Sequence, residues 1–266
     1  MSRVAGDRGY TLVELLVVVA ILGLVAAAIG GVYQVSVQAY TRSSSLEDAQ
    51  VGARAGLERM VTELRLIGAF WTGATGAGTA ITTATSTSIT FMADVNGDTV
   101  ISGAETTTTA AIASDSTTVV VNASATNVAS SFNVYQTATL NDYLYIADGA
   151  TREVSRVSGV SGSTLTLATA LYYSYTVGSL VRSVETVTYN FDAATGSLTR
   201  SVGGSGASTI VDNVTGLTLT YFDATGTLLS APVTLASIRE IQVSLTTQGS
   251  DGSRRTLASR VRRRDL

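Results

Sequence analysis

The sequence predicts an α+β protein: one long N-terminal α-helix packed on a C-terminal antiparallel β-rich domain. The first observation is a run of 27 consecutive uncharged residues, Leu15 to Thr41, which continues into apolar residues at three- and four-residue spacing. The second is a series of short segments after residue 88 in which apolar and polar residues alternate between turn signals. The composition agrees, because threonine, serine, glycine, alanine and valine dominate and there is a single proline.

The helix is expected to run from Tyr10 to about Gly68. Its apolar half exceeds the ~20 residues that cross a bilayer as a helix. Its second half is amphipathic, with one apolar stripe facing a domain and charged residues, including the i,i+4 pair Arg59/Glu63, on the other face. The stripe consists of Leu46, Ala49, Ala53, Leu57, Met60, Leu64 and Ile67. At 1.5 Å per residue, such a helix is about 90 Å long.

Glu14 is the only charged residue between Tyr10 and Thr41. A carboxylate within the hydrocarbon costs on the order of 2.5–3.5 kcal/mol, so it usually has a partner. One interpretation is a lone acid that snorkels to the interface or stays protonated. The other is a contact between subunits in which the charge of Glu14 fixes their relative position along the helix axis. If the chain were cut after Gly9, Tyr10 would carry a free α-amine, and a neighbouring subunit shifted along the helix could place its amine against Glu14.

These residues resemble the type IV prepilin signal: a short polar leader, Gly9, an aromatic residue, Thr-Leu-Val-Glu14 and a long apolar helix. The resemblance implies that a prepilin peptidase cuts between Gly9 and Tyr10 and that Tyr10 is N-methylated. Tyr10 replaces the family's usual phenylalanine but keeps the aromatic ring. It further implies a pilin-like fold, with a leader at 1–9, an N-terminal pilin helix at 10–70 and a β-rich globular domain at 71–266. Residues 10–33 would lie in the membrane or in the filament core.

Two other interpretations explain the apolar run less well. An ordinary secretory signal would be cleaved near Ala26-Ala27-Ala28, but the helical pattern continues past Ala28 and an h-region needs no Glu14. A plain N-terminal anchor explains the length of the run but not its charge.

Gly23, Gly30 and Gly31 each weaken the helix by roughly 1 kcal/mol relative to alanine. They indicate either close helix packing or a stretch that bends or melts in a filament.

The β-rich part is expected to follow a loose linker at 71–88. Strands are expected at Ile89–Met92, Thr117–Asn122, Tyr143–Ala147, Glu153–Val157, Thr164–Leu167, Leu180–Phe191, Leu198–Val202, Leu217–Phe222 and Ile238–Thr246. Two segments, Tyr189–Gly196 and Tyr221–Gly226, each place an Asp…Gly turn after an aromatic strand end. Asp192 and Asp223 are therefore interpreted as turn formers rather than as catalytic acids.

Several segments together look like minor pilins of the PilW type and the related minor pseudopilin J of type II secretion. They are the helix end from Ala53 to Met60 with Glu63-Leu64-Arg65 and Gly68, the 187–191 hairpin strand, the 213–221 strand and the 238–243 segment. The middle, at about 114–178, is expected to be an inserted subdomain.

This resemblance implies a structural subunit that primes or caps assembly of a type IV pilus or a type II secretion pseudopilus. Its partners would be other minor and major pilins or pseudopilins, the prepilin peptidase/methyltransferase and inner-membrane lipid. The precursor would be a single-pass protein of the bacterial inner membrane with its C-terminal domain extracytoplasmic, and later part of a cell-surface or periplasmic filament. The alternative is a membrane-anchored extracytoplasmic binding domain or adhesin that does not polymerise.

A calcium loop is a second candidate site. Oxygen ligands fall at the EF-hand spacing, with a backbone carbonyl at position 7. The candidate ligands are Asp94, Asn96, Asp98, Val100, Ser102 and Glu105. Thr99 stands where the loop expects glycine, and Gly97 comes earlier. Ca²⁺ would clamp a loop between strands. The competing interpretation is a hairpin turn at Asn96-Gly97 with acidic neighbours for solubility.

The composition argues against an enzyme. Cysteine and histidine are absent and all 17 basic residues are arginine, which removes the usual general base, zinc ligand and Schiff-base lysine. Charge is unevenly distributed: residues 66–238 carry a net charge of −7 and residues 239–266 a net charge of +4. The arginine-rich tail, 254–264, could contact DNA, but no aromatic residue interleaves with it. A solvated terminal strand, or an acidic patch on a neighbouring subunit, explains the tail more simply.

Overall fold

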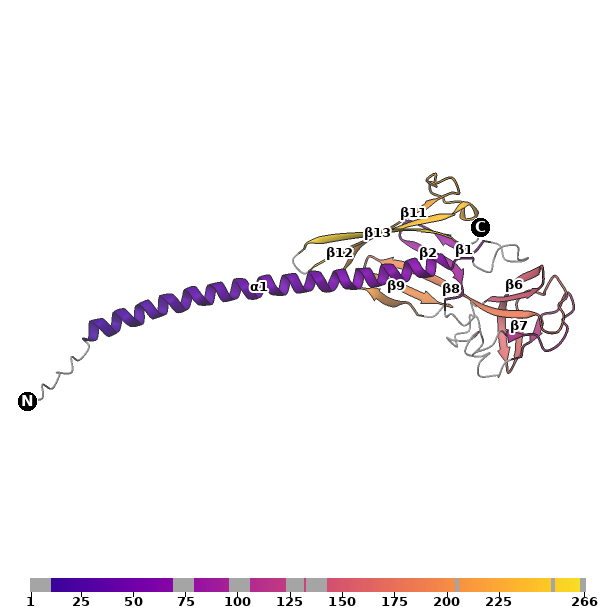
Figure 1. Ribbon diagram of the computed structural model, residues 1–266, viewed down its shortest axis with the longest axis horizontal. Coiled ribbons are helices and arrows are strands. Elements are labelled where there is room, and N and C mark those ends of the chain that lie inside the picture. Colours follow the sequence, from indigo (N-terminus) through magenta and orange to yellow (C-terminus); the bar gives the residue numbers. More distant parts are fainter. Residues whose placement is uncertain are drawn as a thin grey trace, which may run out of the picture.

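The computed structural model describes residues 11–68, 79–95, 106–122, 132, 143–203, 206–249 and 252–263. Its first element is α1 (Leu12–Arg65), a single helix of 54 residues that leads into a head built of β-strands (Figure 1). The α+β fold class is confirmed. The helix ends three residues before the predicted limit, because Leu66 caps it and Gly68 adopts a positive φ of 70°, the left-handed conformation that commonly terminates helices.

The head contains thirteen described strands and one short 3₁₀ helix. They are β1 (Ile81–Ala84), β2 (Ser88–Ala93), β3 (Thr106–Thr107), β4 (Thr118–Val120), β5 (Tyr143–Asp148), β6 (Thr151–Ser161), β7 (Thr164–Leu167), β8 (Leu180–Asp192), β9 (Ser197–Val202), β10 (Ser208–Val211), β11 (Val214–Phe222), η1 (Leu235–Ser237), β12 (Glu240–Gln248) and β13 (Arg254–Arg262). Each of the nine predicted segments overlaps one of these strands.

The linker predicted at 71–88 is wrong in part, because β1 lies inside it. Only Ile81 of β1 is fully buried, so the segment shows no alternation that would reveal a strand. Its partner supplies the missing signal: β1 pairs antiparallel with β2, with Ile81 opposite Phe91. The arginine-rich tail, for which a solvated terminal strand was one expectation, forms β13, and most residues of this strand are exposed.

The long strand β8 connects two parts of the head. Its residues 185–190 pair with β2 and 187–192 with β9, beside α1. Its residues 180–184 pair with β5, and 180–181 with β3, in the part of the head that also holds β6 and β7 (Figure 1). A separate three-stranded sheet, β11-β12-β13, packs against α1.

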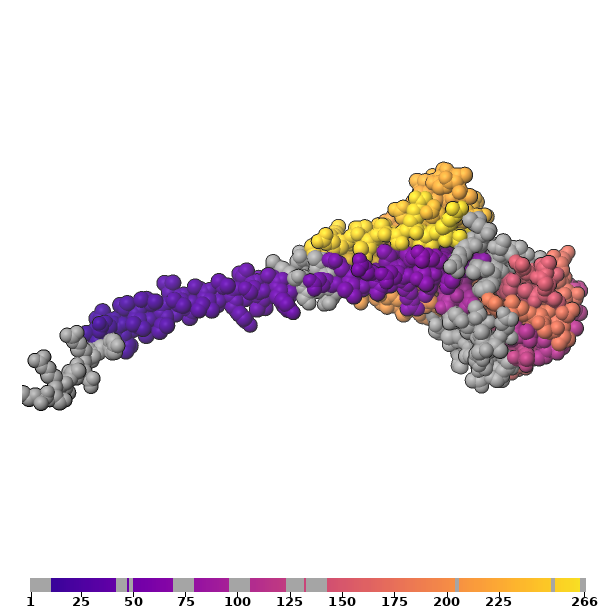
Figure 2. Space-filling view, viewed as in Figure 1, coloured from indigo at the N-terminus to yellow at the C-terminus, as the bar shows by residue number. Residues whose placement is uncertain are grey.

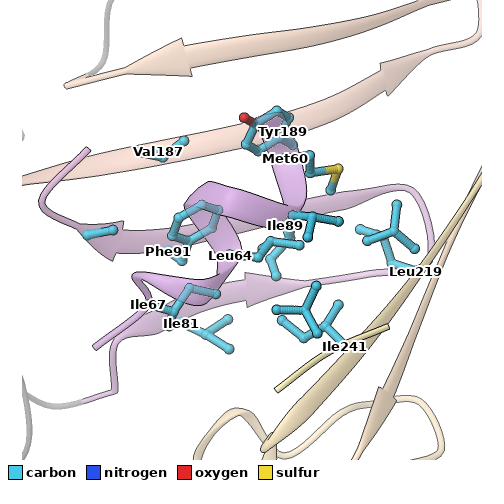
Figure 3. Close-up of a cluster of buried hydrophobic side chains, with 14 of the residues drawn as sticks. Met60, Leu64, Ile67, Ile81, Ile89, Phe91, Val187, Tyr189, Leu219 and Ile241 are labelled. Atoms are coloured by element: carbon cyan, nitrogen blue, oxygen red, sulfur yellow. The ribbon is translucent and has the colours of Figure 1, made fainter. Parts of the chain in front are cut away.

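The first core lies between α1 and the two sheets. Five residues of the predicted helical stripe are buried there: Ala53, Leu57, Met60, Leu64 and Ile67. Figure 3 shows Met60 and Leu64 near Ile89 of β2 and Ile67 near Ile81 of β1, with Ile241 of β12 in the same cluster. The helix thus joins both sheets into one hydrophobic core, which fixes the direction in which its N-terminal half leaves the head.

The second core lies inside a small barrel. Strands β8, β5, β6, β7 and β4 are neighbours in that order, and β3 pairs with β8. An antiparallel bridge between Thr108 and Val121 joins the ends of β3 and β4, so these six described strands form a closed ring. The ring encloses its own set of buried side chains, from Ile112 to Val181, including Phe132 and Leu144. The inserted subdomain was expected at about 114–178, which lies inside the range from Ile112 to Val181 that this second core spans.

Candidate functional site: the N-terminal helix and its junction with the head

The N-terminal half of α1 stands clear of the head. Residues Leu12–Thr41 form a helical stretch of 30 residues that is long and apolar enough to cross a membrane, and none of it is buried. Figure 2 shows this stretch projecting from the head without covering side chains along its length (Figure 2). Because water does not solvate such a surface favourably, it requires lipid or other apolar helices around it.

Glu14 takes part in a capping box at the start of α1. Its backbone N–H donates to Thr11 Oγ1 at 3.3 Å, and its Oε2 accepts from Thr11 N–H at 2.9 Å and from the Thr11 hydroxyl at 3.1 Å. This capping role was not among the predictions for Glu14. The Thr11-x-x-Glu14 spacing before an apolar run is the signal that identifies it.

The capping box leaves half of the carboxylate available. Both bonds from Thr11 reach Oε2, and in the described part of the chain no hydrogen bond to Glu14 Oε1 is found. Glu14 can therefore cap its own helix and still accept a donor from another chain. The predicted processing residues, Gly9 and Tyr10, lie outside the described residues.

The other end of α1 is anchored by Glu63. The predicted i,i+4 pair of Glu63 with Arg59 is confirmed, but its predicted place on the polar face is wrong, because Glu63 is only 7% exposed. Its carboxylate accepts from Tyr189 Oη at 2.7 Å and from Arg200 Nε at 2.9 Å, in addition to Arg59 Nε at 3.2 Å. Burial, reinforced by the negative charge of Glu63, raises the pKa of the Tyr189 hydroxyl well above its usual value. The helix is thereby locked to β8 and β9.

The predicted calcium loop lies mostly outside the described residues. Of its ligands only Asp94 is described, at 7% exposure directly after β2. The others are Asn96, Asp98, Val100, Ser102 and Glu105. The described residues contain no group of three acidic, histidine or cysteine side chains placed to hold a metal.

The flanking strands fix both ends of the predicted loop. Ala93 pairs with Glu185 and Thr106 with Val181, so the loop begins and ends beside the same strand, β8. Glu185 is itself buried, and its Oε2 accepts from Val95 N–H at 3.1 Å. A second carboxylate, that of Glu185, which was not among the predicted ligands, therefore lies at the start of the loop.

Several carboxylates of the head accept hydrogen bonds from other residues of the head. As predicted, Asp192 and Asp223 form turns: Asp192 Oδ2 accepts from the Thr195 hydroxyl at 2.8 Å, and Asp223 Oδ1 from the Thr225 hydroxyl at 2.7 Å. These hydroxyl bonds lower the pKa of both carboxyl groups. Asp148, Glu153 and Glu185 also accept hydrogen bonds from the head. Of these five carboxylates, those of Glu153 and Glu185 are buried, so part of the negative charge of the head lies in its interior.

The basic tail forms β13, an edge strand of the three-stranded sheet. Arg260 binds the Glu240 carboxylate with two nitrogens, at 2.5 and 2.8 Å, and lies over the Phe222 ring. Arg263 is buried, and its Nη1 donates to the Ile238 carbonyl at 3.0 Å. The remaining described arginines of β13 are exposed on an edge, where charge discourages pairing with foreign strands.

Comparison with known proteins identifies one feature. A family model of the prokaryotic N-terminal methylation motif matches residues 5–30. No curated protein and no solved structure matches the chain. The matched segment contains Gly9, Tyr10 and Glu14, together with the first half of the exposed apolar helix.

Proposed function

We propose that this type IV prepilin-like protein is a minor pilin or pseudopilin, of the PilW or pseudopilin J kind, that primes or caps assembly of a type IV pilus-like filament. The observation that carries the proposal is the contrast between the two halves of α1. One continuous helix is exposed on all sides over the apolar stretch Leu12–Thr41 and buries one face in the head from Ala53 onward. Such a helix can transfer from lipid to a bundle of similar helices without refolding the head.

Processing would precede assembly. Cleavage between Gly9 and Tyr10 by a prepilin peptidase/methyltransferase would leave an N-methylated amine one residue before the helix N-cap, Thr11. Until then the exposed helix would hold the precursor in the bacterial inner membrane, with the head outside the cytoplasm. The chemistry belongs to the peptidase; this chain acts by assembly and not by catalysis.

Glu14 would then set the register of the subunit in the filament. Its Oε2 is occupied by Thr11, and its Oε1 is available to the amine of a neighbouring pilin or pseudopilin. In an apolar helix bundle, a charge-assisted hydrogen bond between these groups is stronger than one in water, and an unpaired carboxylate is costly. The correct register is favoured because only in that register does the Glu14 carboxylate meet the amine of the neighbouring subunit.

The barrel supports a terminal place in the filament. It lies beyond the C-terminal end of α1, on the side of the head away from the apolar half (Figure 1). A subunit repeated along a filament must leave room for the heads of the next subunits, whereas a subunit at the tip can carry additional mass in this direction. The barrel therefore favours a minor subunit over a repeating one.

Calcium is proposed as a structural ligand of the loop from Asp94 to Glu105. Support comes from the EF-hand spacing of its oxygen-bearing residues, and from the buried carboxylates of Asp94 and Glu185 where the loop begins. The ion would clamp the connection between the helix-packed part of the head and the barrel.

The deciding experiment is the intact mass and N-terminal sequence of the protein recovered from its own host's membrane. A chain that begins at N-methylated Tyr10 supports the pilin class. A chain that begins at Ile29, or that still carries Met1, contradicts it and favours a secreted domain or a plain anchor. Immunogold labelling of sheared filaments then tests the terminal role, which requires label at filament ends and not along their length.

A further inference from the structure

Exposed hydrophobic side chains gather in one loop of the barrel. Outside α1, four large hydrophobic side chains in the described residues are exposed, and three of them lie in the loop between β7 and β8. These are Tyr172 at 69%, Tyr173 at 38% and Val177 at 63% exposure. The fourth, Leu228, lies elsewhere in the head. Scattered exposed hydrophobic residues need no explanation, but a group within six consecutive residues does.

A buried carboxylate holds the backbone that carries the tyrosines. Glu153 of β6 is 4% exposed and accepts from the backbone N–H groups of Tyr172, at 2.5 Å, and Tyr173, at 3.2 Å. It also accepts from the hydroxyl of Tyr175 at 3.1 Å. A charged acceptor with three donors is a strong fixed point for a loop.

The second half of the loop is held in the same way. Asp148 accepts from the backbone N–H of Thr176 at 3.1 Å and from its hydroxyl at 2.7 Å. Leu171 and Tyr175 are buried in the barrel core, and Tyr175 exchanges two backbone hydrogen bonds of 2.8 Å with Ile112. Residues anchored to the barrel thus flank the exposed side chains on both sides, and the loop is ordered before any ligand arrives.

The three exposed side chains themselves, two tyrosines and a valine, carry no charge. Tyr172 and Tyr173 lie edge to face, with ring centroids 4.9 Å apart and planes at 85°, and Tyr172 is largely exposed. The nearby carboxylates of Glu153 and Asp148 are occupied by donors of the loop itself. Three side chains form a surface far smaller than the ~800 Å² that each partner contributes to a stable protein interface. A small, neutral ligand with flat apolar faces and hydroxyl groups fits these properties.

We propose that this loop, the Tyr172 loop, is a binding site for neutral carbohydrate, in which a sugar ring stacks on Tyr172. The apolar C–H face of a pyranose packs on an aromatic ring, and rigid tyrosines on loops provide large contact area at low entropic cost. The site goes beyond the proposed assembly role and does not depend on it. The barrel places the loop beyond the end of α1, away from the membrane segment (Figure 1).

The test is calorimetric titration of the full chain, in detergent micelles, with the hexamers of β-1,4-linked glucose and of β-1,4-linked N-acetylglucosamine. We expect at least one hexamer to bind. Tyr172→Ala should weaken binding by about fivefold or more, whereas Tyr172→Phe, which keeps the ring, should weaken it by less than about twofold. Leu228→Ala, which removes an exposed apolar side chain elsewhere on the head, is the matched control and should leave the dissociation constant unchanged.

Each contrary result is informative. Absence of binding of both hexamers at millimolar concentration overturns the proposal, and so does binding that Tyr172→Ala leaves intact. If the loop instead captures a protein subunit of the filament, and Tyr172→Ala abolishes that capture while neither sugar binds, the site is a protein contact and the carbohydrate proposal is wrong. Because Tyr172 is exposed, the variants should unfold at the same temperature as the wild type, which a thermal scan verifies.

Discussion

The Glu63 carboxylate on α1 accepts a 2.7 Å hydrogen bond from the hydroxyl of Tyr189 on β8, across 126 residues of sequence. Arg200 of β9, whose side chain is only 11% exposed, forms an ion pair with the same carboxylate. Three elements therefore share one buried polar centre at the junction of helix and head. This centre sets the angle of the apolar helix relative to the sheet, which an assembling subunit must hold constant.

Removal of this hydrogen bond should destabilise the head. Tyr189→Phe leaves a buried carboxylate with one donor fewer, and a hydrogen bond to a charged group contributes about 1.5–3 kcal/mol. Glu63→Ala should cost more, because it also leaves Arg200 without its partner. Denaturant unfolding in micelles measures both changes. Glu58→Ala, on the exposed face of the same helix, is the control and should stay within about 0.5 kcal/mol of wild type.

The buried tyrosines should make the head sensitive to alkali. Burial raises the pKa of Tyr175, Tyr189 and Tyr221 above the usual value of about 10. The unfolded chain therefore releases these protons first, and the stability that they contribute is present below about pH 10 and is lost as the pH rises further. Burial and the charge of Arg239 lower the pKa of Arg263 to about 10, which acts in the opposite direction above that pH.

Because three tyrosines oppose one arginine, we expect the unfolding temperature to fall above about pH 10. Tyr189→Phe, although less stable at neutral pH, should show a shallower decline. A decline that is equally steep in this variant would show that Tyr189 does not contribute to the alkaline transition.

Two glycines of α1 should respond in opposite ways to alanine. A Cβ on Gly56 would lie 2.1 Å from Cγ2 of Val211, a buried β-branched residue that cannot move aside easily, whereas a Cβ on Gly52 meets nothing within 4 Å. Gly52→Ala should stabilise the helix by up to about 1 kcal/mol. Gly56→Ala should destabilise the head by about 1–3 kcal/mol through overpacking. Val211→Ala combined with Gly56→Ala should recover part of the loss; additive costs would rule out the clash.

Substitutions of Thr11 and Glu14 can separate the effect of the capping box of α1 from the effect of the negative charge of Glu14. Glu14→Gln keeps an N3 side chain that can complete a capping box but removes the negative charge. Thr11→Val removes the cap, at a local cost of about 0.5–2 kcal/mol, and keeps the charge. If Glu14 pins the register, Glu14→Gln and Glu14→Leu should both abolish recovery of the subunit in sheared filaments, whereas Thr11→Val should reduce it only mildly. Normal recovery of Glu14→Leu would favour a plain anchor.

Calcium should raise the melting temperature of the head. The expected cause is binding by the loop from Asp94 to Glu105, so Asp98→Ala should abolish the increase. Asp115→Ala, which alters an exposed acid outside that loop, should retain it. An unchanged melting temperature of the wild type on addition of calcium would disprove the calcium clamp.

Much of the fold could be predicted from local patterns. The uncharged run and the stripe of Met60, Leu64 and Ile67 defined α1, and alternation located nine strands. The segments that escaped prediction are the short strands β1, β3 and β10, which span four, two and four residues. Each is defined by its pairing with a longer strand, β2, β8 or β9, and β1 buries little beyond Ile81.

By itself, the sequence determined the processing motif, the membrane-length helix and the α+β class, because charge, glycine position and hydrophobic period act over neighbouring residues. Only the tertiary structure decided which polar residues are buried. Glu63 was expected in solvent and Glu153 was interpreted only as part of a strand, yet each accepts several hydrogen bonds in the interior of the head. Their partners come from strands and loops far along the chain. Closure of the barrel likewise depends on a bridge between Thr108 and Val121 that no local pattern encodes.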